Sequence, residues 1–230
     1  MSSLFPILLA VAYALVMYRF SAWQTARTLD QKSHPLRDPD LLRAMDRIAV
    51  ALDLPRIAVH VFEVDPVNGL AAPDGRIFLT EGFLRQYRRG EVTADEMAAV
   101  IAHELGHVAL GHTRRRMIDF TGANAVFVML TALLSRFLPF IGIWIANLIS
   151  SAVMAGISRK DEFEADAYAS ALLIKAGIGT AAQKSLFRKL DRLTGNRGTT
   201  PAWLLSHPSC ADRIAAIEAN EARWQAAVSA

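Results

Sequence analysis

The sequence has 230 residues, of which 53% are hydrophobic and 20% are charged. This length fits one domain of moderate size, with or without membrane segments. The composition excludes a disordered chain, which would be poor in apolar residues and strongly charged. A single cysteine, Cys210, excludes a disulfide-stapled scaffold. The formal net charge of +3 is too small to indicate a nucleic-acid partner, and arginines beside membrane segments explain it equally well.

The first stretch of the chain is apolar. Residues 1–18 carry no charged side chain, and five lysines or arginines follow between positions 19 and 43. A signal peptide would begin with a basic segment, so the pattern favours an uncleaved N-terminal membrane anchor over residues 1–20. The positive-inside rule then places the rest of the chain on the cytoplasmic side of the cell (inner) membrane.

A second apolar stretch covers residues 120–158 and is interrupted by one charge, Arg136. As helices, its two arms would be about 24 and 33 Å long, against a hydrocarbon core of roughly 30 Å. Basic residues flank the outer ends, and only Arg136 lies near the tip. This asymmetry favours a helical hairpin, residues 118–158, inserted from the cytoplasmic side. The alternatives are a buried hairpin in a soluble core and an amphipathic pair lying on the bilayer.

The remaining segments, residues 38–117 and 159–230, have the patterns of a folded unit. Thr93 and Glu96 form a capping-box pattern that opens a long helix ending near position 113. Periodicity and turn residues predict further helices over 40–52, 161–176, 180–193 and from Ser209 to about 226, with strands over 57–62, 70–72 and 76–80. The predicted fold class is α+β, mainly α.

The strongest chemical signal is the H-E-x-x-H motif formed by His103, Glu104 and His107. On a helix, the two histidines project from one face about one turn apart, which suits two imidazoles that hold one zinc ion. Glu104 is rotated by about 100° from His103 on such a helix. It can therefore take a proton from a water molecule that the zinc ion activates. The sequence predicts one Zn²⁺ per chain.

A catalytic zinc ion needs a third protein ligand. The best candidate is Glu162, which lies in a predicted helix. Asp166 follows four residues later on the same face, where it can accept the free ring N–H of a ligand histidine. Two other polar residues are weaker candidates. His112 is expected to point off the motif face as an imidazole at the helix end, and Glu164 is expected to be a solvated carboxylate.

With these residues in place, the sequence resembles the HtpX / CAAX-prenyl-protease family of membrane-associated zinc peptidases. The resemblance covers roughly residues 40–224. It rests on four blocks, namely the H-E-x-x-H helix, the apolar hairpin, Ser158-Arg159 with Glu162 and Asp166, and Ser206-His207-Pro208 leading to Arg213-Ile214. With one anchor and one hairpin, the chain looks like a minimal member, too short for the many-span chamber of the CAAX prenyl proteases.

The resemblance implies a glutamate-type zincin (gluzincin) core with a small β-hairpin beside the active-site helix. In that core, Glu162 is the third ligand and Asp166 lies behind a ligand histidine. The resemblance also implies that His207 and Arg213 lie near the active site, with His207 as the donor to the oxyanion. An edge strand would pair with the extended substrate backbone through Asn68, Gly69, Leu70 and Ala71.

The predicted activity is that of a zinc metalloendopeptidase, in which Glu104 is the general base and His207, with Arg213, stabilises the oxyanion. The expected substrates are membrane or misfolded proteins, as in protein quality control, and the other expected partner is the lipid bilayer. Two alternatives stay open. One is a non-catalytic membrane adaptor on a peptidase fold, and the other is a zinc hydrolase with a non-protein substrate.

Overall fold

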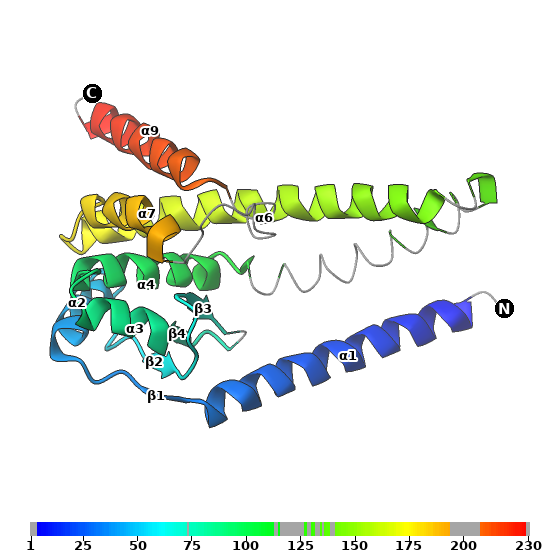
Figure 1. Ribbon diagram of the computed structural model, residues 1–230, viewed down its shortest axis with the longest axis horizontal. Coiled ribbons are helices and arrows are strands. Elements are labelled where there is room, and N and C mark those ends of the chain that lie inside the picture. Colours follow the sequence, from blue (N-terminus) through cyan, green and yellow to red (C-terminus); the bar gives the residue numbers. More distant parts are fainter. Residues whose placement is uncertain are drawn as a thin grey trace.

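The structure is a computed structural model that describes residues 4–72, 74–112, 141–193 and 208–228, together with single positions between 115 and 138 (Figure 1). These residues form a mainly helical fold with one small mixed sheet. The predicted fold class is therefore confirmed at the level of α+β, mainly α. The first arm of the predicted apolar hairpin lies largely outside the described residues, and so does His207.

The sheet has the strand order β1-β2-β4-β3. Strand β1 (Ser33–Pro35) is antiparallel to β2 (Val59–Phe62), and β2 is parallel to β4 (Ile77–Thr80). Strand β3 (Gly69–Ala71) is antiparallel to β4, with Gly69 opposite Leu79. This is the predicted hairpin, and it leaves β3 at one edge of the sheet. Strand β1 was not predicted, because three residues are too few to show an alternating pattern.

Side-chain caps fix the starts of the helices that surround the sheet. Helix α2 (Pro39–Ala51) begins where the Asp38 carboxylate accepts hydrogen bonds from two backbone N–H groups. Helix α4 (Ala94–Ala109) begins with the predicted capping box of Thr93 and Glu96. Helix α3 (Glu81–Arg88) is not predicted from the sequence, because Thr80 both ends β4 and caps α3 and no loop separates the two elements.

Helix α6 (Gly142–Lys175) is one continuous helix of 34 residues. The sequence predicts a hairpin that ends at residue 158 and a new helix that begins at 161, and this boundary is wrong. The chain changes there from apolar to charged, which alters its surroundings but contains no proline that would interrupt the backbone hydrogen bonds. The last helices, α7 (Ala181–Leu193) and α9 (Cys210–Val228), follow the predicted positions, and the Ser209 hydroxyl accepts from the Asp212 N–H at the start of α9.

Helix α4 lies at the centre of the fold, packed against α2, α6, α7 and the sheet. Its apolar face enters the main core, whose fully buried side chains include Leu41, Met45, Ile48, Ile77, Leu79, Phe83, Met97, Ile101 and Leu173. A helix held from several sides has little freedom to move. Polar side chains on the α4 face toward α6 are therefore presented in a fixed position.

Two long helices extend from the same side of this core (Figure 1). Helix α1 (Leu4–Gln31) continues well past the predicted anchor, residues 1–20. The first half of α6, which covers most of the second arm of the predicted hairpin, projects from the core. Within the described part of the chain, no helix has both the length and the apolar character needed to cross a membrane. The predicted anchor and membrane hairpin are therefore not shown by this structure.

Candidate metal centre and active site

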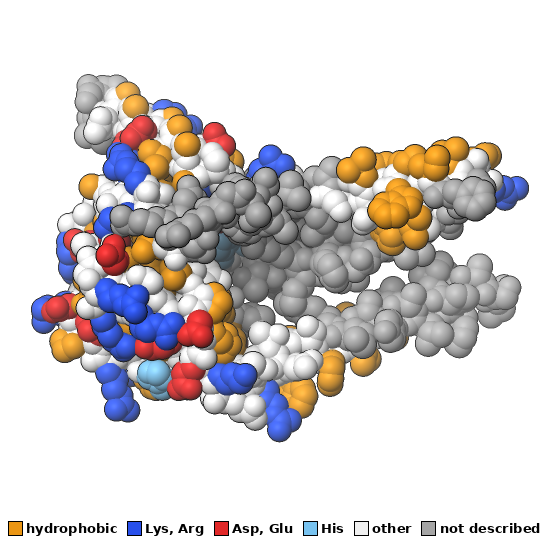
Figure 2. All heavy atoms as spheres, in the orientation of Figure 1, with side chains coloured by type: hydrophobic (Ala, Val, Ile, Leu, Met, Phe, Trp, Pro, Cys, Tyr) orange, Lys and Arg blue, Asp and Glu red, His pale blue; other side chains and the backbone are white. Residues whose placement is uncertain are grey.

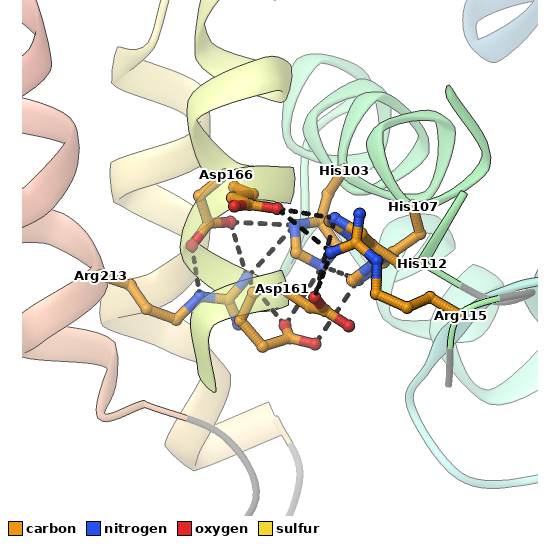
Figure 3. Close-up of polar contacts among 9 residues, drawn as sticks. His103, His107, His112, Arg115, Asp161, Asp166 and Arg213 are labelled. Carbon is orange, nitrogen blue, oxygen red and sulfur yellow. Dashed lines mark hydrogen bonds and ion pairs between the residues drawn. The ribbon is translucent and has the colours of Figure 1, made fainter. Parts of the chain in front are cut away.

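The candidate centre lies where α4 crosses α6 (Figure 3). His103 and His107 come from α4, and Glu162 comes from α6. The crossing is close because Gly106 has no side chain, and a Cβ atom there would lie 3.0 Å from the carbonyl oxygen of Ala165. This short separation lets a carboxylate of α6 reach the two imidazoles of α4.

Three side chains converge on one point. The Nε2 atoms of His103 and His107 are 3.1 Å apart, and Glu162 oxygens lie 3.4 and 3.5 Å from these two nitrogens. Ligands at about 2.0–2.2 Å from a tetrahedral zinc ion would be separated by about 3.3–3.6 Å. The donor types, their spacing and their burial therefore fit a zinc ion held by His103, His107 and Glu162.

Behind His103 stands a buried carboxylate, that of Asp166. The His103 Nδ1 is 2.9 Å from an Asp166 oxygen, so its N–H can donate to Asp166 while Nε2 faces the donor cluster. Arg213, from α9, donates to both Asp166 oxygens at 2.6 and 2.7 Å. The guanidinium also lies over the ring of Phe187, 4.2 Å from its centroid. The position of the Asp166 carboxylate, and through it the His103 ring, is thus fixed from a third helix.

The charges of this group influence one another strongly. Burial lowers the pKa of His103, but hydrogen bonds with Asp166 and Glu162 outweigh it and raise that pKa to about 9. Burial raises the pKa of Asp166, while the charge and hydrogen bonds of Arg213 hold it below its ordinary value. Asp166 is therefore an ionised acceptor. A cation that binds the Nε2 of His103 has to displace a proton, so metal binding here releases protons.

Glu104 lies on α4 beside the donor cluster and faces strand β3. A Cβ atom on Gly69 would be 3.4 Å from a carboxylate oxygen of Glu104, so the strand and the carboxylate are in contact distance. Among the residues that the structure describes, Glu104 makes no hydrogen bond or ion pair, which leaves its carboxylate oxygens available as acceptors. The predicted base and the predicted substrate strand are therefore brought together.

The four predicted substrate contacts lie on or beside β3. Gly69, Leu70 and Ala71 pair with β4 on one side, while the other side is an edge of the described sheet. The Asn68 backbone is tied to Thr80, whose hydroxyl accepts from the Asn68 N–H at 3.0 Å. This anchoring fixes the strand next to α4. An extended chain could add to the free edge, as in β-augmentation.

His112 differs from its expected place. It is fully buried, and its Nδ1 is 2.9 Å from the Nδ1 of His107. The sequence predicts a helix that ends near position 113, but α4 ends at Ala109, and Gly111 has a φ of +69°. This left-handed residue turns the chain back, so helical spacing no longer predicts where His112 points. Burial lowers the pKa of His112.

Glu164 is not simply a solvated carboxylate either. One of its oxygens is 3.1 Å from the Nε2 of His112, and the side chain is 37% exposed. Asp161, also on α6, lies 3.8 Å from the same nitrogen. Of the signals available in the sequence, only the glycine directly before His112 could have indicated this arrangement, since it marks a helix end.

The two predicted oxyanion residues have different outcomes. His207 lies outside the described residues, and its role stays a prediction. Arg213 is close to the centre, but its guanidinium is bound to Asp166 and lies 3.6 Å from Glu162. The geometry thus places Arg213 behind His103 and its acceptor Asp166.

His103, His107 and Glu162 form a donor set of the kind that holds one zinc ion. Residues 35–221 match the sequence model of Peptidase family M48, and the chain belongs to that family. This confirms the resemblance found in the sequence, and relatives named Protease HtpX homolog are also among the matches.

Two curated relatives and one solved structure show how far the similarity extends. The chain is 33% identical over 160 residues to the mitochondrial metalloendopeptidase OMA1 of Schizosaccharomyces pombe, covering 70% of this chain and 45% of that protein. It is 33% identical over 153 residues to the metalloprotease LoiP of Escherichia coli, covering 66% and 58%. The chain thus spans about half the length of these relatives. The crystal structure of S. mikatae Ste24p shares the fold, with a TM-score of 0.59 and 22% identity over 92% of this chain and 56% of that chain.

Proposed function

We propose that this protein is a membrane-associated, zinc-dependent endopeptidase that hydrolyses peptide bonds in membrane or misfolded proteins. The observation that carries the proposal is the convergence of His103, His107 and Glu162 beside Glu104 and an edge strand. A bound zinc ion supplies Lewis-acid activation of a water molecule and of the scissile carbonyl. Amide hydrolysis requires a metal ion that activates water and a base that takes its proton, and this set of groups provides for both. A metal site without a base would not.

We assign each residue of the site a separate role in the reaction. The free edge of β3 holds the substrate extended, so that its scissile carbonyl lies near Glu104. Glu104 takes a proton from the attacking water and passes it to the leaving amine. Asp166, fixed by Arg213, keeps the His103 ring in the orientation and tautomer that binds the metal. We assign Arg213 this positioning role.

The donor to the oxyanion is proposed to be His207. In the sequence, this residue precedes α9, the helix that carries Arg213. A preorganised donor at the developing negative charge contributes roughly 3 kcal/mol to transition-state stabilisation. The family resemblance supports this assignment.

A bilayer is the proposed second partner. Large apolar side chains are exposed along α1 and near the start of α6, and Figure 2 shows apolar atoms gathered on the outer end of α6. They are Leu15, Val16, Phe20, Trp23, Phe137, Leu138, Ile141, Ile143, Trp144, Leu148 and Ile149. Exposed apolar area of this kind marks an interaction surface. The basic residues that follow the apolar N-terminus support an orientation with the peptidase domain in the cytoplasm, which reporter fusions at the C-terminus would test.

The proposed activity is tested with the full chain purified in detergent and loaded with zinc. An unfolded model protein is the substrate for wild type, Glu104→Gln and, as a matched control, Glu218→Gln at an exposed position of α9. We expect Glu104→Gln to bind zinc normally and to lose about 10²–10⁴-fold in rate, while Glu218→Gln cleaves like wild type. Equal cleavage by Glu104→Gln would show that the base is wrongly assigned. Zinc binding without cleavage by any variant would favour the adaptor or the non-protein hydrolase.

A further inference from the structure

We propose that His112 is a positioning residue for His107, which it orients through a hydrogen bond between the two imidazoles. The inference rests on the proposed function, because it takes His107 to be a zinc ligand. The two Nδ1 atoms are 2.9 Å apart, and the rings meet edge to face with centroids 5.1 Å apart. His112 is completely buried, so water does not compete for this bond.

The tautomers of the two rings follow from simple proton counting. A neutral imidazole has one N–H and one lone pair. If the Nε2 of His107 binds zinc with its lone pair, its Nδ1 carries the hydrogen and donates it to the Nδ1 of His112. His112 then carries its own hydrogen on Nε2. That N–H faces a carboxylate oxygen of Glu164 at 3.1 Å and one of Asp161 at 3.8 Å.

This arrangement makes the surroundings of the two ligand histidines alike. His103 donates to Asp166, which is fixed by Arg213, and His107 donates to His112, which is fixed by Asp161 and Glu164. Arg115 lies 3.4 Å from Asp161 and 3.8 Å from Glu164, and compensates their charge. The four acidic residues of α6 form two overlapping pairs. Glu162, the proposed zinc ligand, and Asp166 are four residues apart. Asp161 and Glu164, the acceptors for His112, are three residues apart.

The same cluster of His112, Asp161 and Glu164 could be taken for a second metal site. The proton count argues against it. A metal on the Nε2 of His112 would place the hydrogen on Nδ1 and turn the Nδ1 of His107 into an acceptor. His107 would then carry its hydrogen on Nε2 and could not bind zinc. Arg115 also occupies the charged side of this cluster, where a cation would be repelled.

The first test compares two substitutions of His112 by their affinity for Zn²⁺, measured in the full chain by competition with a chromophoric chelator. His112→Leu removes the acceptor, and His112→Asn places an amide oxygen near the position of Nδ1. Loss of such an outer partner typically weakens metal binding by 10–100-fold. We expect that loss for His112→Leu and recovery to within about threefold of wild type for His112→Asn. His34→Leu, at an exposed histidine of β1, is the control and should bind like wild type.

The second test needs no substitution. With ¹⁵N-labelled histidine in the zinc-loaded wild-type chain, long-range ¹H–¹⁵N spectra identify which ring nitrogen carries hydrogen. We expect hydrogen on Nδ1 of His107 and on Nε2 of His112. Hydrogen on the Nδ1 of His112 would overturn the proposal. This measurement also decides the matter if His112→Leu does not fold.

The outcomes separate this inference from the proposed function. If wild type binds no zinc, or if His103→Ala binds it as tightly as wild type, the proposed metal centre is wrong and the role of His112 falls with it. If wild type binds zinc and His112→Leu binds it equally well, only the role of His112 is overturned. Equal weakening by His112→Leu and His112→Asn would also overturn it, because the ring's shape rather than its acceptor would then matter.

Discussion

Gly106 in α4 lies directly against the backbone of Ala165 in α6. A Cβ atom at Gly106 would be 3.0 Å from the carbonyl oxygen of Ala165 and 3.1 Å from its Cα. Because these atoms belong to a helix backbone, they cannot rotate away as a flexible side chain would. The absence of one methyl group therefore sets the distance between the helix with the two histidines and the helix with Glu162.

Gly106→Ala should separate these helices by a few tenths of an ångström. Overpacking of this kind costs about 1–3 kcal/mol, and the higher helix propensity of alanine offsets roughly 1 kcal/mol of it. We expect a net loss of stability of about 1 kcal/mol and roughly tenfold weaker Zn²⁺ binding, because ligand distances tolerate only about 0.2 Å. Urea unfolding of the zinc-free chain and chelator competition measure the two effects. Gly156→Ala, in α6 with open space around it, should instead be neutral or stabilising.

Gly69 provides the space in which the Glu104 carboxylate meets strand β3. A Cβ atom there would lie 2.6 Å from a methyl group of Val100 and 3.4 Å from a Glu104 oxygen. Gly69→Ala should therefore displace the strand or the base and reduce the rate of peptide hydrolysis by about tenfold, since small misplacements at a reacting centre are costly. Val100→Ala removes the closest clash, so the double variant should recover most of the rate. Activity of Gly69→Ala equal to wild type would contradict the proposed contact between strand and base.

The pair of Arg213 and Asp166 is buried, and its disruption should be expensive. Arg213→Met leaves the Asp166 carboxylate without its charge partner, which costs about 3–5 kcal/mol at buried pairs. The comparison is Arg85→Met, which breaks an exposed pair with Asp65 at 2.6 Å and should cost at most about 1 kcal/mol. Chemical denaturation of the zinc-free chains measures both. Similar losses for the two variants would mean that Arg213 does not hold Asp166 in place.

Glu96 should make the stability of the fold depend on pH. Burial raises the pKa of Glu96, but hydrogen bonds from Lys189, Ser185 and the Thr93 backbone outweigh it and lower the pKa below its ordinary value of 4.5. The folded state therefore holds the ionised form more strongly than the unfolded state. The resulting stabilisation is present above pH 4.5 and is lost as the pH falls through and below that value.

Glu96→Gln tests this dependence. At pH 7 the variant should be less stable than wild type by about 1–2 kcal/mol, the order of a hydrogen bond to a charged group. The difference should shrink as wild type becomes protonated below pH 4.5. Urea unfolding at several pH values measures it, with Glu63→Gln at an exposed position as the control. A difference that stays constant down to pH 3 would show that the charge of Glu96 is not responsible.

Much of the local structure was predictable because its signals are contained in short segments. The capping box of Thr93 and Glu96 marked the start of α4, and Gly177 marked the end of α6. The continuity of α6 was missed, because a change from apolar to charged residues looks like a boundary in the sequence although the backbone runs on. Strand β1 forms because it pairs with β2, which lies almost thirty residues later in the chain. The three residues of β1 contain no pattern that predicts this pairing.

The sequence by itself predicted the chemistry of the candidate site from two histidines and a glutamate at helical spacing and from a later helix with acidic residues four apart. Helix geometry fixes such neighbours within one or two turns. The predicted place of Asp166 behind His103 agrees with the structure, but only the tertiary structure decided that Arg213 holds Asp166 and that His112 lies against His107 and Glu164. Arg213 reaches Asp166 across 47 positions of the chain, and His112 meets Glu164 across 52. These contacts depend on the docking of α9 and α6 onto α4 and on the turn at Gly111, and no periodicity in the sequence records how separate helices pack.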